Sequence, residues 1–437
     1  MLLASSAIAA SLLLSDAASA QTAAAPADET SDVVVLGTRR TDRTVTNSAS
    51  PIDVISATEL SSVPAANMLD QVKNLVPSFY VGQNSISDAS TFVRSPSLRG
   101  LPGDEVLVMI NGKRYNRSAL VQVYSGSDTG LGFGSQGSDL SAIPSIAIKS
   151  LEVLREGATA QYGSDAIGGV LNYGLKEKSG LEVVGRYGQY YQNGDGKSYQ
   201  IAADLGVGIG DIGFINIAGE YDNEGQTSRC VTRPAAANFA ALFPALASQL
   251  PNYPGPSQIW GNSPSHGYKL MLNSAIDVTS NSKIYFFGNF AHIKADESFN
   301  YRAAVTTTAV DQAGVTHTLG ANGSFAPIYL TQCPAGNATC PAGGFVKDTN
   351  TFSFSSIYPA GFTPRFVGVT QEIYGTLGYK GDIGGLKYDL SGSLSKNTLD
   401  LSMYQSLNAS YGPQSQTSFK FGKPDTSSSM TSDTASL

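Results

Sequence analysis

Long tracts of alternating apolar and polar residues in the second half of the chain most constrain how it can fold. Past about residue 180, each tract runs for about ten residues. In one of them a single face carries Tyr199, Ile201, Ala203, Leu205, Val207 and Ile209, and the other carries Gln200, Asp204 and glycines. Strands of ~9–11 residues with this period span a bilayer with their apolar side chains toward lipid, whereas strands of soluble proteins average ~5–6 residues. The tracts therefore predict membrane-spanning β-strands.

The connections between these tracts are alternately short and long. We expect strands near residues 181–192, 198–209, 212–222, 267–278, 282–294, 370–380, 386–398 and 415–422. Short turns on one rim and long loops on the other are typical of outer-membrane barrels. The tract at 282–294 departs from the pattern, because it is apolar on both faces at Ile284, Tyr285, Phe286 and Phe287.

Composition agrees with an exported, β-rich chain. Charged residues make up 14% of the 437 residues, against roughly 25% in ordinary soluble proteins. The net charge is −7, and no basic cluster exceeds Arg39-Arg40, so we expect no nucleic-acid binding. Residues 1–20 hold a short apolar run and an Ala-x-Ala pattern at 18–20, which predicts a cleaved signal peptide. No stretch of ~18 consecutive apolar residues predicts a membrane helix.

Residues 51–178 have the mixed pattern of a compact α+β domain. Ser56 to Glu59 forms a capping-box pattern at the start of a helix. An amphipathic helix is expected at 67–72, and a strand at 106–110 leads into the hairpin signal Asn111-Gly112. Residues 121–139 are rich in Gly and Ser and are expected to form a long loop.

The stretch 143–176, IPSIAIKSLEVLREGATAQYGSDAIGGVLNYGLK, is dense in glycine, which permits close approach of one backbone to another. It resembles the end of the plug domain of TonB-dependent outer-membrane receptors, where E-V-L-R-x-G-x-x-A-x-Y-G-x-x-A-x-G-G-V-x-N is typical. Leu98-Arg99-Gly100 and the strand and turn at 106–112 follow in the order of that family. Glu156 stands where many relatives have Asp.

This resemblance implies an α+β plug domain followed by antiparallel transmembrane β-barrel strands. About eight strands are present, too few to enclose a plug, since plugged transporters have about 22. The chain also ends in a Ser/Thr-rich tail at 426–437 rather than on a strand with a terminal aromatic. We therefore expect a fragment with four parts: a signal peptide at 1–20, a flexible leader at 21–50, a plug at 51–178 and a partial barrel at 181–437.

The resemblance also assigns residues that contact partners. The β-prone run at 32–36 resembles the TonB box, which would pair with TonB by strand addition; the alternative is a first edge strand of the next domain. Its residues are Asp32, Val33, Val34, Val35 and Leu36. Arg99 and Arg155 match arginines that face barrel glutamates and seat the plug, although either could be an ordinary surface arginine.

Function follows from the resemblance as an expectation. It implies a Gram-negative outer-membrane receptor for TonB-dependent uptake of a scarce nutrient, a ferric siderophore or similar large ligand, with oligosaccharides or cobalamin as alternatives. A passive porin or surface adhesin is the non-transport alternative. Partners would be TonB with its inner-membrane energising complex, a small-molecule or metal-chelate ligand, and outer-membrane lipid. Candidate ligand contacts are Tyr80, Arg94, Arg117, Tyr124 and Phe133.

The sequence offers no pattern for catalysis, a metal or a cofactor, so we expect no enzyme. The G-x-G-x-x-G match at 208–213 joins two predicted strands and is read as a turn. The three histidines show no ligand spacing. Cys333 and Cys340 are spaced for a short-loop disulfide, while Cys230 is left over, and the sequence alone does not decide the pairing.

Overall fold

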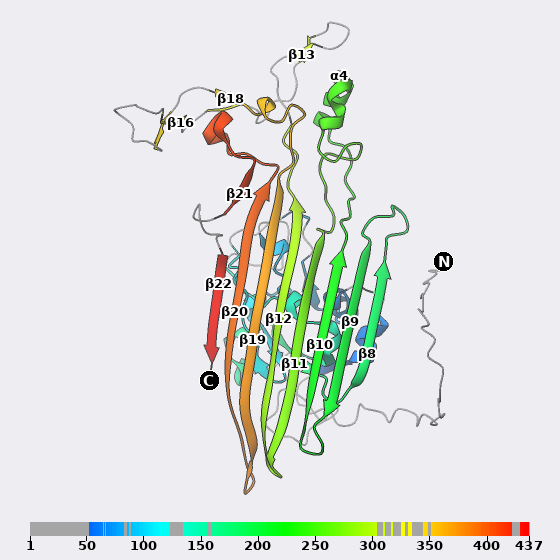
Figure 1. Cartoon of the computed structure of the whole chain (residues 1–437), viewed down its shortest axis with the longest axis vertical. Coiled ribbons are helices and arrows are strands. Elements are labelled where there is room, and N and C mark those ends of the chain that lie inside the picture. The colour runs from blue at the N-terminus through cyan, green and yellow to red at the C-terminus, as the bar shows by residue number, and fades with distance from the viewer. Residues whose placement is uncertain are drawn as a thin grey trace.

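The computed structural model describes residues 52–63, 65, 67–82, 85–86, 89–122, 134–155, 159–303, 309–310, 316–317, 325–327, 331–333, 344–347, 351–421 and 429–436. The chain forms a mixed N-terminal domain and a sheet of long antiparallel strands that faces it (Figure 1). Several predictions lie outside the described residues: the signal peptide at 1–20, the leader at 21–50 with its segment 32–36, Tyr124, Phe133 and Cys340. No helix in the described part of the chain is long and apolar enough to cross a membrane.

The N-terminal domain is built on a five-stranded sheet. Its order is β1 (Ile52–Ser56), β6 (Ile148–Leu154), β7 (Gly169–Leu175), β4 (Val106–Ile110) and β5 (Lys113–Arg114). All five residues of the Val-Leu-Val-Met-Ile run in β4 are buried, which fits its position inside the sheet. A separate pair joins β2 (Phe79–Val81) to β3 (Pro96–Leu98). The predicted strand and hairpin at 106–114 are confirmed.

Helices cover this sheet, and they begin at the capping residues that the sequence predicts. In α1 (Ala57–Ser62), Ser56 and Glu59 form the capping box, with the Ser56 backbone N–H donating to Glu59 at 2.7 Å. In α2 (Met68–Leu75), Asn67 caps the first turn, and Met68, Leu69 and Val72 enter the core. Short helical turns complete the domain: α3 (Thr159–Tyr162), η3 (Ala89–Thr91), η4 (Gly103–Glu105), η5 (Leu140–Ala142), η6 (Ser145–Ala147) and η7 (Ser164–Ala166).

The Gly168-Gly169 pair shows why the stretch 143–176 needs glycine. A Cβ on Gly168 would lie 2.9 Å from the Glu105 carbonyl oxygen, and one on Gly169 would lie 2.6 Å from that of Leu154. Gly169 also has φ = +133°, a conformation that other residues rarely adopt. The tight backbone packing expected from the sequence is therefore present.

The second half of the chain forms the long-stranded sheet. Each of its main strands pairs antiparallel with the next: β8 (Gly180–Gly188), β9 (Ser198–Gly208), β10 (Gly213–Glu224), β11 (Ser265–Thr279), β12 (Ser282–Ser298), β19 (Arg365–Ile383) and β20 (Leu386–Tyr404). Turns after β9, β11 and β19 lie at one rim and the long connections at the other, as predicted (Figure 1). β12, β19 and β20 extend several residues past the predicted bounds.

The end of the chain departs in part from the predicted strands. β21 (Ser418–Lys420) lies within the strand expected at 415–422, whereas β22 (Ser429–Ser436), which also pairs with β20, lies in the Ser/Thr-rich tail, where no strand was predicted. β20 is an edge strand whose free N–H and C=O groups accept a further strand. Backbone pairing of this kind does not require the apolar alternation on which the sequence prediction depended.

The long connections carry only short elements. The connection after β10 contains α4 (Pro234–Leu242) and η8 (Pro244–Gln249). The connection after β12 contains η9 (Phe354–Ser356) and three short strand pairs: β13 (Ala309–Val310) with β14 (Thr316–His317), β15 (Phe325–Pro327) with β18 (Thr351–Ser353), and β16 (Thr331–Gln332) with β17 (Phe345–Val346). The connection after β20 contains η10 (Ala409–Gln414).

The two faces of the long-stranded sheet differ as the alternation predicts. Leu270, Leu377, Leu390 and Leu394 point away from the N-terminal domain and are 50–71% exposed. Aromatic pairs such as Tyr199–Tyr221 and Tyr379–Tyr388 lie near the two rims on this outer face, as in the interfacial girdles of membrane barrels. The exception in β12 has a physical reason: Tyr285 and Phe287 are buried on the inner face, in one core with Tyr115 of the N-terminal domain.

Candidate functional site

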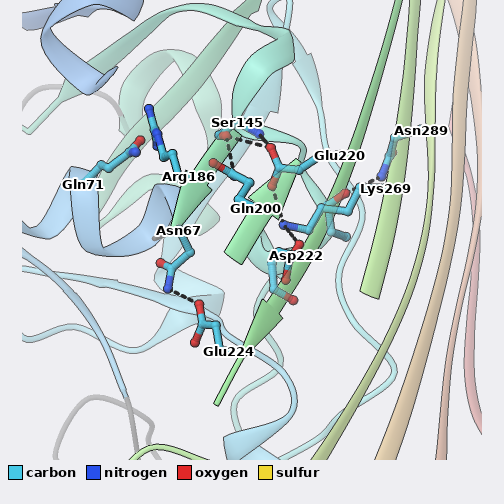
Figure 2. A network of polar contacts seen from close by, with 12 residues as sticks. Asn67, Gln71, Ser145, Arg186, Gln200, Glu220, Asp222, Glu224, Lys269 and Asn289 are labelled. Carbon is cyan, nitrogen blue, oxygen red and sulfur yellow. Dashed lines mark hydrogen bonds and ion pairs between the residues drawn. The ribbon is translucent and has the colours of Figure 1, made fainter. Parts of the chain in front are cut away.

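A buried ionic network joins the N-terminal domain to the inner face of the sheet (Figure 2). Lys269 on β11 forms ion pairs with Glu220 at 2.8 Å and Asp222 at 2.9 Å, both on β10. The Lys269 side chain is 7% exposed and that of Glu220 is 1% exposed. Ser145 at the start of η6 donates its backbone N–H and its hydroxyl to the other Glu220 oxygen, at 2.7 and 2.6 Å. Glu220 thus links the wall to the domain that it faces.

Strand register extends this network into a continuous row across five strands. Glu220, Lys269, Ala291, Glu372 and Asn397 are cross-strand neighbours in turn, on β10, β11, β12, β19 and β20. We call this set the wall row. Ala291 is its only small member, and from two positions along the same strand Asn289 donates to the carbonyl of Ala142 in η5 at 3.3 Å.

The far end of the wall row contacts a second part of the N-terminal domain. The Asn397 side-chain oxygen accepts the Ala119 backbone N–H at 2.7 Å, and its amide group donates to Glu372. Glu372 is 2% exposed and Asn397 is fully buried. The row therefore fixes the domain at Ser145 and at Ala119, on opposite sides of η5.

A small cavity of about 70 Å³ lies beside the network, toward the rim that carries the long loops. Its lining combines Arg94, Asp222 and Glu224 with the polar loop residues Asn262 and Ser263. Two guanidinium nitrogens of Arg94, Nε and Nη2, are buried and form no hydrogen bond among the described residues. Asn67 at the start of α2 donates to Glu224, which connects the helix to the wall beside this cavity (Figure 2).

A family model identifies the N-terminal domain. Residues 44–170 match the model for the TonB-dependent Receptor Plug Domain. The chain carries the plug domain of a TonB-dependent receptor. The long-stranded sheet that faces the plug is therefore part of the barrel wall, and its outer face is apolar.

Two curated relatives agree with this family. The chain is 31% identical over 195 residues to the vitamin B12 transporter BtuB of Photobacterium profundum, a match that covers 44% of this chain and 28% of that protein. It is 27% identical over 183 residues to the ferric enterobactin receptor of Pseudomonas aeruginosa, covering 41% of this chain and 24% of that one. Both matches thus span less than a third of the relative.

Solved structures resemble the chain more distantly. The siderophore receptor PirA from Acinetobacter baumannii is 17% identical with a TM-score of 0.44, and the match covers 82% of this chain and 46% of that one. The ferric citrate transporter FecA in its unliganded form is 12% identical with a TM-score of 0.41, over 85% and 50% of the two chains.

The two arginines expected to seat the plug have described partners within the plug. Arg155 forms an ion pair with Asp53 of β1. Arg99, in a left-handed conformation with φ = 56°, donates to the carbonyl of Ile167 at 2.9 Å and to that of Gly168 at 3.3 Å. Their predicted pairing with barrel glutamates stays a prediction. Other plug residues contact the wall, among them Ser145, Ala119 and Lys113, whose ammonium lies 3.0 Å from Asp389 of β20, and the sequence prediction missed them.

The three described ligand candidates lie in different surroundings. Arg94 lines the cavity beside the wall, and Tyr80 is 39% exposed with the Lys73 ammonium 5.4 Å from its ring centre. Arg117 forms an ion pair with Asp165 at 3.0 Å, and Arg114 pairs with the same carboxylate. Burial opposes ionisation of Asp165, but the two arginines outweigh burial and lower the pKa of its carboxyl.

The described residues include no cluster of three or more His, Cys, Asp or Glu side chains that could hold a metal ion. Cys230 is a free cysteine that accepts the Trp260 backbone N–H. Because Cys340 lies outside the described residues, its predicted disulfide with Cys333 stays a prediction.

Proposed function

We propose that this chain belongs to an outer-membrane receptor of a Gram-negative cell that takes up a scarce nutrient by active, TonB-dependent transport. The observation that carries the proposal is a plug domain held by buried polar contacts against a wall of strands whose outer face is apolar. A passive porin needs no plug, and surface adhesion does not require a buried, hydrogen-bonded domain inside the barrel.

Known relatives support the choice of nutrient. The curated relatives are named for vitamin B12 and for ferric enterobactin, both large ligands. For this chain we propose a ferric siderophore or a similar large ligand, with cobalamin and oligosaccharides as alternatives. The cavity beside Arg94 supports ligand entry from the long-loop rim, because its lining joins the plug to loop residues 262 and 263. Tyr80, Arg117, Tyr124 and Phe133 remain proposed contacts.

Energy for uptake would come through TonB. The segment from Asp32 to Leu36 precedes the plug and has the β-prone composition of a strand that pairs with a partner edge. Proline removes a backbone N–H donor, so Val34→Pro should weaken that pairing. The substitution changes no residue of the plug or of the wall.

A binding assay tests this proposal without knowledge of the nutrient. We expect the purified periplasmic domain of TonB to bind outer membranes that carry the unaltered protein or the control variant Ala24→Pro, and to lose binding to Val34→Pro. Equal binding to all three proteins would contradict the proposed TonB box. Growth of the same strains on ferric enterobactin, on vitamin B12 or on oligosaccharides as the limiting nutrient then distinguishes the ligand classes.

A further inference from the structure

Oxygen atoms without hydrogen bonds gather where the plug meets the Glu372 end of the wall row. They belong to two carboxylates and two amides: Asp139 Oδ2, Glu372 Oε1, Asn116 Oδ1 and Asn289 Oδ1. Each of these residues is at most 6% exposed. Buried acceptors without a donor are costly, so a set of them in one place calls for a positively charged or donating occupant.

These residues lie close enough to interact. Tyr115 and Asn116 approach Glu372 from the plug, and Glu372 and Asp139 interact electrostatically. Asn289 donates its amide to the Tyr115 hydroxyl at 3.1 Å, so its oxygen belongs to the same group. The pKa of the Tyr115 hydroxyl is raised well above its ordinary value, first by burial and then by the negative charge of Glu372 and Asp139.

The protein supplies no cation with a described contact to these oxygens. Lys269 is committed to Glu220 and Asp222, and Ala291 separates it from Glu372 in the wall row. Arg94 lowers the pKa of Asp139 through its charge, yet burial outweighs this effect and raises that pKa. The hydrogen bond from Arg94 to Asp139 comes from its backbone and ends on Oδ1, as do both bonds from Ser141, so Oδ2 stays open.

We propose that Asp139, Glu372, Asn116, Asn289 and Tyr115 form a binding site for a calcium-like divalent cation between plug and barrel wall. Two carboxylates would balance the double charge, and amide and hydroxyl oxygens are the ligands that calcium accepts alongside them. Water would complete the shell. The cavity beside Arg94 is lined by Leu140 and Ser141, which directly follow Asp139 in the chain. The inference goes beyond the proposed uptake and does not depend on the nutrient.

Terbium luminescence tests this site on the full-length protein in detergent. Terbium(III) replaces calcium at oxygen sites, and the rings of Tyr115 and Tyr374, 4.9 Å apart, lie at the right place to sensitise it. We expect tyrosine-excited terbium emission that calcium competes away. We expect Glu372→Gln and Asp139→Asn each to weaken terbium binding at least ~10-fold, as loss of groups at a metal site commonly does.

Asn116→Ala offers a test that leaves both carboxylates in place and should also weaken binding. Asp277→Asn is the matched control, because this carboxylate is exposed at the tight-turn rim. Calcium should raise the thermal unfolding temperature of the unaltered protein and of Asp277→Asn, but not that of the site variants. The proposal would be overturned if the site variants and the control bound terbium with equal affinity. It would also be overturned if calcium did not change the unfolding temperature of the unaltered protein.

Discussion

At the scale of single residues, Lys269 balances the charge of Glu220, the wall carboxylate that binds the plug at Ser145. It neutralises two carboxylates in a place that water barely reaches. Alternation along its strand assigns Lys269 to the polar face from sequence alone. Its partners do not follow from sequence, because Glu220 and Lys269 meet only through the register of β10 and β11 across the connection at 225–264.

Replacing Lys269 by Met should leave Glu220 and Asp222 buried without a cation. We expect a loss of ~3–5 kcal/mol in the free energy of unfolding, as is usual when one partner of a buried pair is removed. The double variant Lys269→Met with Glu220→Gln should regain part of this loss, and the exposed Lys178→Met should change little. Denaturant unfolding in detergent measures these differences; an equal effect of Lys269→Met and Lys178→Met would contradict the assignment.

The Asp165 cluster predicts a dependence on pH. Its pKa is lowered in the folded protein, so its ion pairs stabilise the plug above its ordinary pKa of ~3.9 and are lost as the pH falls through the folded-state value. Because both arginines are about half exposed, Asp165→Asn should cost only ~0.5–1 kcal/mol at pH 7. The difference between variant and unaltered protein should shrink as the pH falls below that ordinary value and vanish below the folded-state pKa. An unfolding difference that stays unchanged across this fall in pH would refute this.

At the scale of elements, the strands were the most predictable part of the chain. Alternation and turn lengths located the seven long strands, because a sheet with one apolar and one polar face must alternate. The strand ends, β22 and the row of contacts across the wall were not predictable. Edge pairing depends on backbone groups rather than on a side-chain pattern. The register between two strands joined by a connection as long as 299–364 cannot be inferred from the sequence.

The outer face of β20 gives a direct test of this assignment. Leu394 is 71% exposed on the side away from the plug and lies toward the middle of the strand, further from the tight turn than the Tyr379–Leu390 pair. Leu394→Arg should cost ~2–4 kcal/mol, as near the middle of the membrane. Leu386→Arg, on the same face beside the tight turn, should cost only ~0–1 kcal/mol, as near the interface. Heat-modifiable migration of the full-length barrel measures assembly, and equal effects of the two arginines would contradict the lipid-facing assignment.

At the scale of the whole molecule, the plug and the rim loops form one assembly with the wall. The rim loops contact one another: the Tyr358 hydroxyl, in the connection after β12, donates to the Ser406 carbonyl, in the connection after β20, at 3.2 Å. The plug in turn is held at Ser145 and Ala119. The motif at 143–176 predicted the plug, but the places where the plug touches the wall became known only from the structure.

The proposed uptake requires the plug to move or unfold relative to the wall, and a disulfide at their contact tests this most directly. Ala119 and Asn397 are in contact, so Ala119→Cys with Asn397→Cys, in a Cys230→Ser background, should form a disulfide in an oxidising compartment. We predict that the bonded receptor takes up no nutrient, measured with whichever of ferric enterobactin, vitamin B12 or oligosaccharide supports growth, and that a reductant restores uptake. Uptake by the bonded receptor at the rate of the single-cysteine variants would contradict the account.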